Sequence, residues 1–100
     1  MTSNTHNLLV LMVPEAIKDK VVDTLIAQPS LSGFSLSKIQ GFSAKNNHFN
    51  IQEQVEGYKD LYRFEVLHEI QQTEALIALV KTSFKELKFR FWVTPVLYAG

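Results

Sequence analysis

With 100 residues the chain has the length of one domain, over residues 1–100, and its ten basic and ten acidic residues give a formal net charge of zero. Because the balanced charge provides no basic field to gather phosphates, we expect no nucleic-acid binding. The lack of cysteine excludes disulfides and thiolate chemistry, and no apolar run is long enough for a membrane span, so we expect a soluble cytoplasmic protein without direct membrane insertion.

The first predicted element is a strand over the continuous apolar run 8–13. Both faces of such a strand must be covered, so it belongs in the middle of a sheet. Pro14 then fits the first turn of a helix, because its missing N–H costs nothing there. The buried stripe of this helix is formed by apolar residues at helical spacing: Ile17, Val21 and Leu25.

A second strand is predicted from about residue 33 to residue 42, where Phe34 and Leu36 share one parity. Ile39 breaks this parity, and a β-bulge near Ser37 would return it to the core face. The chain is then polar over residues 43–58. A segment of this length without clear structure inside a compact domain predicts a flexible, functional loop.

A third strand is predicted where Tyr62, Phe64 and Val66 alternate with polar residues, and Thr73 is a suitable N-cap for the second helix. A last strand follows from about residue 87. The order strand, helix, strand, strand, helix, strand predicts the α+β class. The expected fold is a ferredoxin-like βαββαβ sandwich, with a four-stranded antiparallel sheet and two helices on one face.

Two helices on one face leave the other face of the predicted sheet uncovered. Trp92, Val96 and Tyr98 lie on the opposite parity from the core residues of the last strand. An exposed apolar patch of this kind usually marks an interface, so these three residues are our candidates for an oligomer interface. The alternative is that Trp92 and Tyr98 are single exposed aromatic residues, which need no second copy.

The segment 33–43 resembles the second strand of the nitrogen-regulatory PII proteins, which reads G-x-T-V-x-x-V-x-G-F-G. The spacing of Leu36 and Ile39 and the pair Gly41-Phe42 match this motif. The ending over residues 91–100 resembles an uncharacterised PII-like branch from proteobacteria. The resemblance implies a homotrimer with ATP or ADP in the clefts between its subunits, and it places ligand-binding residues at Gly41, Phe42, Ser43, Lys45 and Lys88.

The same alignment departs from the PII pattern where that family holds phosphate. Ser43 replaces a glycine of the motif, and Lys45 replaces the loop glutamine that helps to hold the magnesium nucleotide. The segment 84–88 has no glycine, and Glu86 would repel phosphate. Lys88 is either the remnant of the phosphate-loop lysine or a strand-edge lysine kept for solubility. We therefore do not expect ATP or ADP binding of the PII type.

The three histidines offer one candidate metal ligand. His48 lies in the predicted loop near Glu53 and Glu56, and imidazole with carboxylate suits divalent zinc, copper or nickel. His68 continues the core parity of the third strand and is expected to be structural, while His6 belongs to the N-terminal segment. No serine has the setting of a nucleophile elbow, so we expect no enzymatic activity.

The PII resemblance implies a signalling or regulatory homotrimer. Such a protein senses a small molecule or a metal ion at the clefts between its subunits and regulates a partner, such as a membrane transporter, through residues 43–58. A second hypothesis is a metal-tolerance trimer of the CutA group, which shares the fold. A third is a structural oligomer without a ligand.

Overall fold

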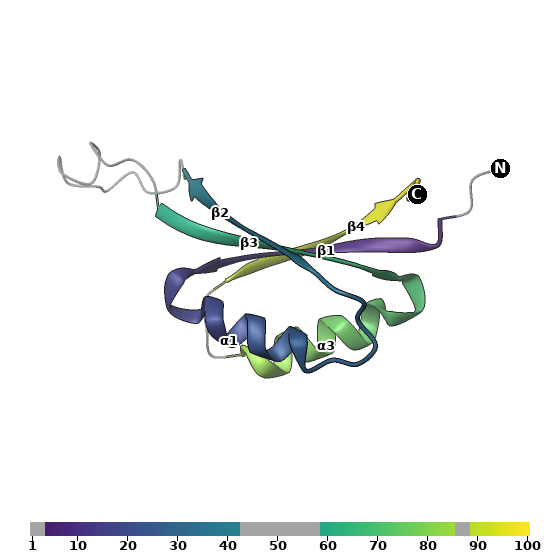
Figure 1. Cartoon of the computed structure of the whole chain (residues 1–100), viewed down its shortest axis with the longest axis horizontal. Helices are drawn as coiled ribbons and strands as arrows, with labels where there is room; N and C mark the ends of the chain where they lie inside the picture. The colour runs from purple at the N-terminus through teal and green to yellow at the C-terminus, as the bar shows by residue number, and fades with distance from the viewer. Residues whose placement is uncertain (1–3, 43–58, 86–88) are drawn as a thin grey trace.

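The computed structural model describes residues 4–42, 59–85 and 89–100 (Figure 1). Its elements in chain order are β1 (His6–Pro14), α1 (Glu15–Ile26), β2 (Ser35–Gly41), β3 (Lys59–Glu69), the short 3-10 helix η1 (Ile70–Gln72), α3 (Thr73–Ser83) and β4 (Arg90–Val96). The strands form one sheet in the order β2-β3-β1-β4, with antiparallel pairing throughout. This confirms the predicted α+β, ferredoxin-like architecture.

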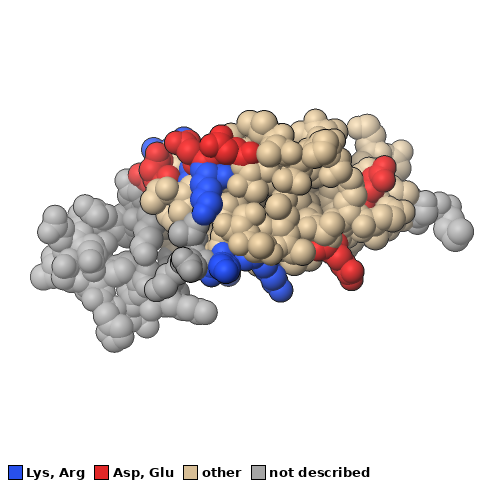
Figure 2. Space-filling model, turned by 90° about the horizontal axis from the view of Figure 1, so that it is seen from below, with Lys and Arg blue, Asp and Glu red and all other residues tan. Residues whose placement is uncertain are grey.

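Both helices lie on one face of the sheet, and the described residues place no helix on the other face (Figure 1). The uncovered side is called the open face below. On the helix side, charged side chains gather toward one end and leave a broad uncharged area (Figure 2). This agrees with the sequence, in which no residue between Asp23 and Lys38 is charged. None of the described helices is long and apolar enough to cross a membrane.

The hydrophobic core fills the space between the helices and the sheet. Its buried side chains come from the two central strands and from one stripe of each helix: Leu9, Leu11, Val13, Phe64, Val66, Ile17, Val21, Leu25, Leu76, Val80 and Phe84. β1 lies between β3 and β4, which confirms its predicted central place. Apolar residues occur on both faces of β1, and Val10, on the side away from the helices, is also only 1% exposed.

Three local predictions were wrong. Pro14 is the last residue of β1 and the N-cap of α1, with an extended backbone (φ −72°, ψ 163°), instead of lying in the first helical turn. Thr73 is the first residue of α3, and Gln72 occupies the N-cap position. There is also no bulge in β2, because its register with β3 runs unbroken from Ser35 to Gly41. Ile39 therefore lies on the open face, opposite Leu61.

Candidate functional site

The open face carries a central apolar row. The side chains of Leu8, Val10 and Met12 point to this face, because Leu9 and Leu11 between them point into the core. Leu67 pairs with Leu8, and Trp92 pairs with Val10. Leu67 is 43% exposed and Trp92 is 37% exposed. The face is thus apolar in its middle although no described helix covers it.

The predicted interface residues reach this surface to different degrees. Trp92 lies near its centre, and Val96 lies at its end, where it pairs with His6. Tyr98 follows the end of β4 and is 83% exposed. Ile39 and Leu61, which were not predicted, extend the apolar row onto the outer strand β2. The interface role of all these residues stays a prediction.

Arginine side chains flank the apolar row of the open face. Arg63 and Arg90 are the cross-strand partners of Met12, one on each side. The Arg63 guanidinium lies 3.3 Å from the Glu65 carboxylate, whereas Arg90 forms no ion pair with another described residue. Arg90 is therefore a positive charge beside an apolar surface, without a counter-charge among the described residues, which suits contact with an anion or with an acidic group of a second copy.

Only two of the ligand residues implied by the PII resemblance lie in the described part of the chain. Gly41 ends β2 and pairs with Lys59, and Phe42 follows with 72% of its surface exposed. The other candidates all lie outside the described residues: Ser43, Lys45, Lys88, and the candidate metal ligand His48. The predicted ligand set is therefore neither assembled nor contradicted. Within the described ranges, no three histidine, aspartate or glutamate side chains lie close enough together to hold a metal ion.

A tyrosine connects the start of α1 to the sheet on the helix side. The Tyr62 ring lies 5.0 Å from the Lys18 ammonium, a cation–π distance. Hydrogen bonding of the Tyr62 hydroxyl toward the Glu15 carboxylate is the main cause of the raised pKa of Tyr62. The negative charge of the carboxylate disfavours a phenolate beside it. The contact therefore favours the neutral tyrosine.

Replacing Glu15 with glutamine is expected to lower the pKa of Tyr62 toward its ordinary value of 10.0. The amide still accepts the hydrogen bond but carries no charge. Because the folded-state pKa is raised, this contact stabilises the fold below the unfolded-state pKa and is lost as the pH rises through the folded-state pKa. Ultraviolet difference titration of the phenolate measures the change.

Asp19→Asn is the matched control for the Tyr62 titration, because Asp19 is the weakest of the carboxylates that raise this pKa. It should move the tyrosine titration less than Glu15→Gln does. Identical titration curves for Glu15→Gln and the unmodified protein would contradict the assigned contact.

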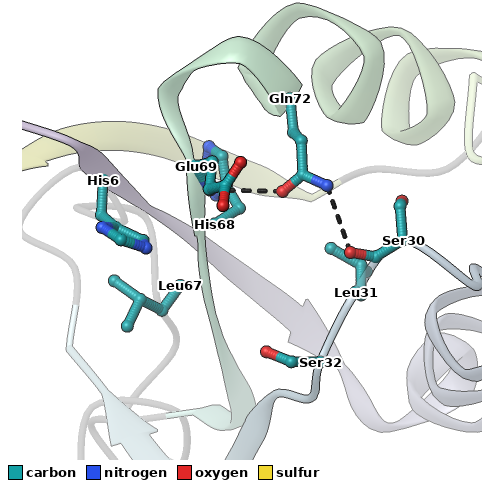
Figure 3. Close-up of a pocket in the computed structure, with 8 residues that line it drawn as sticks. All are labelled: His6, Ser30, Leu31, Ser32, Leu67, His68, Glu69 and Gln72. Atoms are coloured by element: carbon teal, nitrogen blue, oxygen red, sulfur yellow. Dashed lines mark hydrogen bonds between the residues drawn. The ribbon is translucent and has the colours of Figure 1, made fainter.

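A polar hollow lies where the end of β3 meets the connection between α1 and β2 (Figure 3). Its volume is about 220 Å³, and it is lined by His6, Ser30, Leu31, Ser32, Leu67, His68, Glu69 and Gln72. Gln72 connects its walls: its side-chain oxygen accepts a hydrogen bond from the Glu69 amide (3.2 Å), and its amide nitrogen donates to the Ser30 carbonyl (3.1 Å). The shape of the hollow is thus fixed by side chains.

His68 lines this hollow and is only 3% exposed. Its Nδ1 lies 3.0 Å from the Val66 carbonyl, so Nδ1 carries the proton and donates it. Its Nε2 therefore accepts a hydrogen bond from the Thr73 hydroxyl (2.8 Å), and the same hydroxyl oxygen accepts one from the Asn7 amide (2.9 Å). Both ring nitrogens are therefore occupied, as expected for a structural histidine. The Thr73 hydroxyl serves this buried chain and does not cap α3.

Comparisons with known proteins agree with this geometry. The model of a family described as "Protein of unknown function (DUF3240)" matches residues 2–100. A crystal structure of a DUF3240 family protein from Shewanella baltica OS155 is 38% identical in sequence. It superposes with a TM-score of 0.77 over 98% of this chain and 97% of that chain.

More distant structures share the fold alone. CPII, a PII-like protein from Thiomonas intermedia K12 bound to ADP, AMP and bicarbonate, is 14% identical, with a TM-score of 0.68 over 95% of this chain and 93% of its own. CutA from Synechococcus elongatus PCC7942 is 11% identical, with a TM-score of 0.72 over 97% of this chain and 81% of its own. A curated relative is a putative mediator of RNA polymerase II transcription subunit 28 from Dictyostelium discoideum, 30% identical over 81 residues. That match covers 81% of this chain, which spans only 41% of the relative.

Proposed function

Because the chain belongs to the DUF3240 family and shares its fold with PII-like proteins, we propose that it is a non-enzymatic PII-like regulatory protein of the cytoplasm. In this proposal three copies form a homotrimer, a small ligand binds in the clefts between subunits, and binding alters contact with a partner protein. The partner is contacted through residues 43–58, as the sequence predicts, and a membrane transporter is one candidate by the PII resemblance. Residues 43–58 lie outside the described part of the chain.

The observation that carries the proposal is the apolar open face. Ile39, Leu61, Leu67 and Trp92 give this face large apolar side chains on three strands, and the described residues leave it without a covering layer. Exposed apolar surface of this extent is typical of an assembly interface. Copies packed through this face would bury it, and the borders between them would create clefts near its charged edge.

A small anion is the ligand class that the charges of this face favour. Arg63 and Arg90 flank Met12, and Arg90 lacks a counter-charge among the described residues. CPII is bound to ADP, AMP and bicarbonate, and a PII protein from Arabidopsis thaliana is bound to citrate, all of which are anions. The missing glycines at residues 84–88 argue against a PII-type phosphate site, so we favour a small anion over ATP.

Light scattering and a thermal-shift panel test the proposal. The particle mass should be three times the chain mass of 11.4 kDa. An anion such as citrate, bicarbonate or AMP should raise the melting temperature by about 4–8 °C if it contributes about 1 kcal/mol at the concentration used. Arg90→Gln should lose this shift, whereas Lys81→Gln, a matched change on the exposed side of α3, should keep it. A particle of 11.4 kDa, or a panel without any shift, would contradict the proposal.

The CutA-like alternative makes a different prediction in the same panel. If only zinc, copper or nickel raises the melting temperature and His48→Ala abolishes the rise, the metal-tolerance function replaces the anion-sensing one. The fold agrees equally with this alternative, since CutA superposes with a TM-score of 0.72.

A further inference from the structure

A second hollow lies on the helix side, between the connection that follows α1 and the segment formed by η1 and the first part of α3. Its volume is about 290 Å³. Ser30, Leu31 and Gln72 line both this hollow and the hollow of Figure 3. Because α1 and α3 lie on the side of the sheet opposite the open face, this hollow belongs to a single chain and stays accessible if copies associate through that face (Figure 1).

The apolar residues that line this hollow are packed against the core. Leu76 is 5% exposed and belongs to the core itself, and the partly buried Leu31 and Leu79 pack against it. The Leu31 backbone amide donates a hydrogen bond to the Gln28 carbonyl (3.3 Å), which holds this part of the connection in a turn. A cavity of about 150 Å³ lined by such side chains is enough to bind benzene. The hollow therefore has room for one apolar ring with a polar substituent.

The polar residues that line this hollow have amide groups with unused hydrogen-bonding capacity. The Gln71 side chain forms no hydrogen bond with another described residue. The Gln28 side-chain nitrogen donates to the Thr24 carbonyl (3.2 Å), which leaves its side-chain oxygen without a partner among the described residues. A primary amide has both N–H donors and a carbonyl acceptor. Another carboxamide therefore finds complementary groups here.

The hollow offers no charge to an ion. None of the eight residues that line it is charged, and the sequence has no charged residue between Asp23 and Lys38. An ion entering the hollow would lose hydration without gaining a counter-charge, which is unfavourable. The surroundings therefore favour an uncharged ligand, in contrast to the arginine-flanked open face.

We propose that this hollow binds a small uncharged molecule that joins an apolar ring to a carboxamide group. The ring packs on Leu31, Leu76 and Leu79, and the carboxamide pairs with the side-chain amide of Gln71. A preformed, mostly apolar site with a few polar groups is the usual form of a small-molecule site. The site does not rest on the trimer or on the anion proposed above, because it lies within one chain and on the other side of the sheet.

Benzamide is the probe for this site, and benzoate and the benzylammonium ion are its matched controls, because they carry the same ring with a negative or a positive charge. The test is an NMR titration of the full, ¹⁵N-labelled chain. Benzamide should bind with a Kd of about 1 mM, as expected for so small a ligand. The shifts should be largest within residues 28–31 and 71–79. Both ions should bind at least about tenfold more weakly.

Ala75→Phe tests the position of the ligand. Ala75 is exposed on α3 and lines the hollow, so a phenylalanine there fills the space of the ring and should lower the affinity for benzamide at least about tenfold. Ala78→Phe is the matched control, because Ala78 is an exposed alanine of the same helix outside the lining. It should bind benzamide as the unmodified chain does.

Gln71→Met tests the hydrogen bond, because it keeps the length of the side chain and removes the amide. It should weaken benzamide binding about 2- to 10-fold, the effect of one hydrogen bond, and this exposed position leaves the fold intact if Ala75→Phe does not fold. The proposal is overturned if benzamide does not bind, if either ion binds as tightly, if the shifts map to the open face, or if Gln71→Met and a folded Ala75→Phe bind benzamide with unchanged affinity.

Discussion

Trp92→Glu is expected to convert the proposed trimer into folded monomers with a mass of 11.4 kDa. Trp92 lies at the centre of the open face beside Val10 and is 37% exposed in the single chain. A glutamate there stays hydrated in the monomer but would be buried without a partner in the assembly. An uncompensated buried charge costs about 3–5 kcal/mol, and three copies would meet that cost together. Size-exclusion chromatography with light scattering measures the change.

Ile26→Glu is the matched control for this substitution. Ile26 ends α1 on the helix side of the molecule and is 68% exposed, so it offers an even more accessible apolar side chain on the opposite surface. The same exchange of an apolar residue for a glutamate should leave the mass of the particle unchanged there. If Trp92→Glu keeps the mass of the unmodified protein, the open face is not the surface through which copies meet.

Phe64→Ala is expected to lower the free energy of unfolding by about 3–5 kcal/mol, the range for a large aromatic side chain lost from a packed core. Phe64 is 0% exposed, pairs with Leu11 of the central strand, and contacts Phe34 at a ring distance of 5.9 Å. The cavity left behind lies between the sheet and both helices, where neighbouring side chains have little freedom to refill it. Urea denaturation at a fixed protein concentration measures the loss.

Leu97→Ala serves as the control for the core substitution. Leu97 follows β4 and is 75% exposed, so its replacement by alanine removes apolar atoms that already contact water. Its free energy of unfolding should stay within about 0.5 kcal/mol of the unmodified value, the usual range for surface substitutions. A similar loss for both variants would mean that Phe64 does not lie in the described core.

The fold could be predicted from hydrophobic periodicity alone. β1 was placed correctly in the centre of the sheet because its apolar residues occupy both parities. The error at Ile39 has the same origin, because we assumed that a large apolar residue must face the helices. The open face is itself apolar, so Ile39 is accommodated there opposite Leu61 without a bulge. A parity rule fails wherever both faces of a sheet carry large apolar residues.

The candidate sites could be predicted only in part. His68 was correctly expected to be structural from its parity, but its partners Asn7 and Thr73 come from other elements and could not be found from spacing. The polar hollow of Figure 3 was missed because strand register is not visible in one sequence. His6 sits close to the N-terminus, and only the pairing of β1 with β3 brings Glu69 beside it.

Val10 has a further consequence for how the chains come together. It points away from the helices yet is 1% exposed, between its cross-strand partners Glu65 and Trp92. In the single chain the Val10 position is thus already shielded from water, although its neighbours on this face are exposed. If copies associate through the open face, as proposed, we expect dilution to release folded subunits that can mix with those of another preparation.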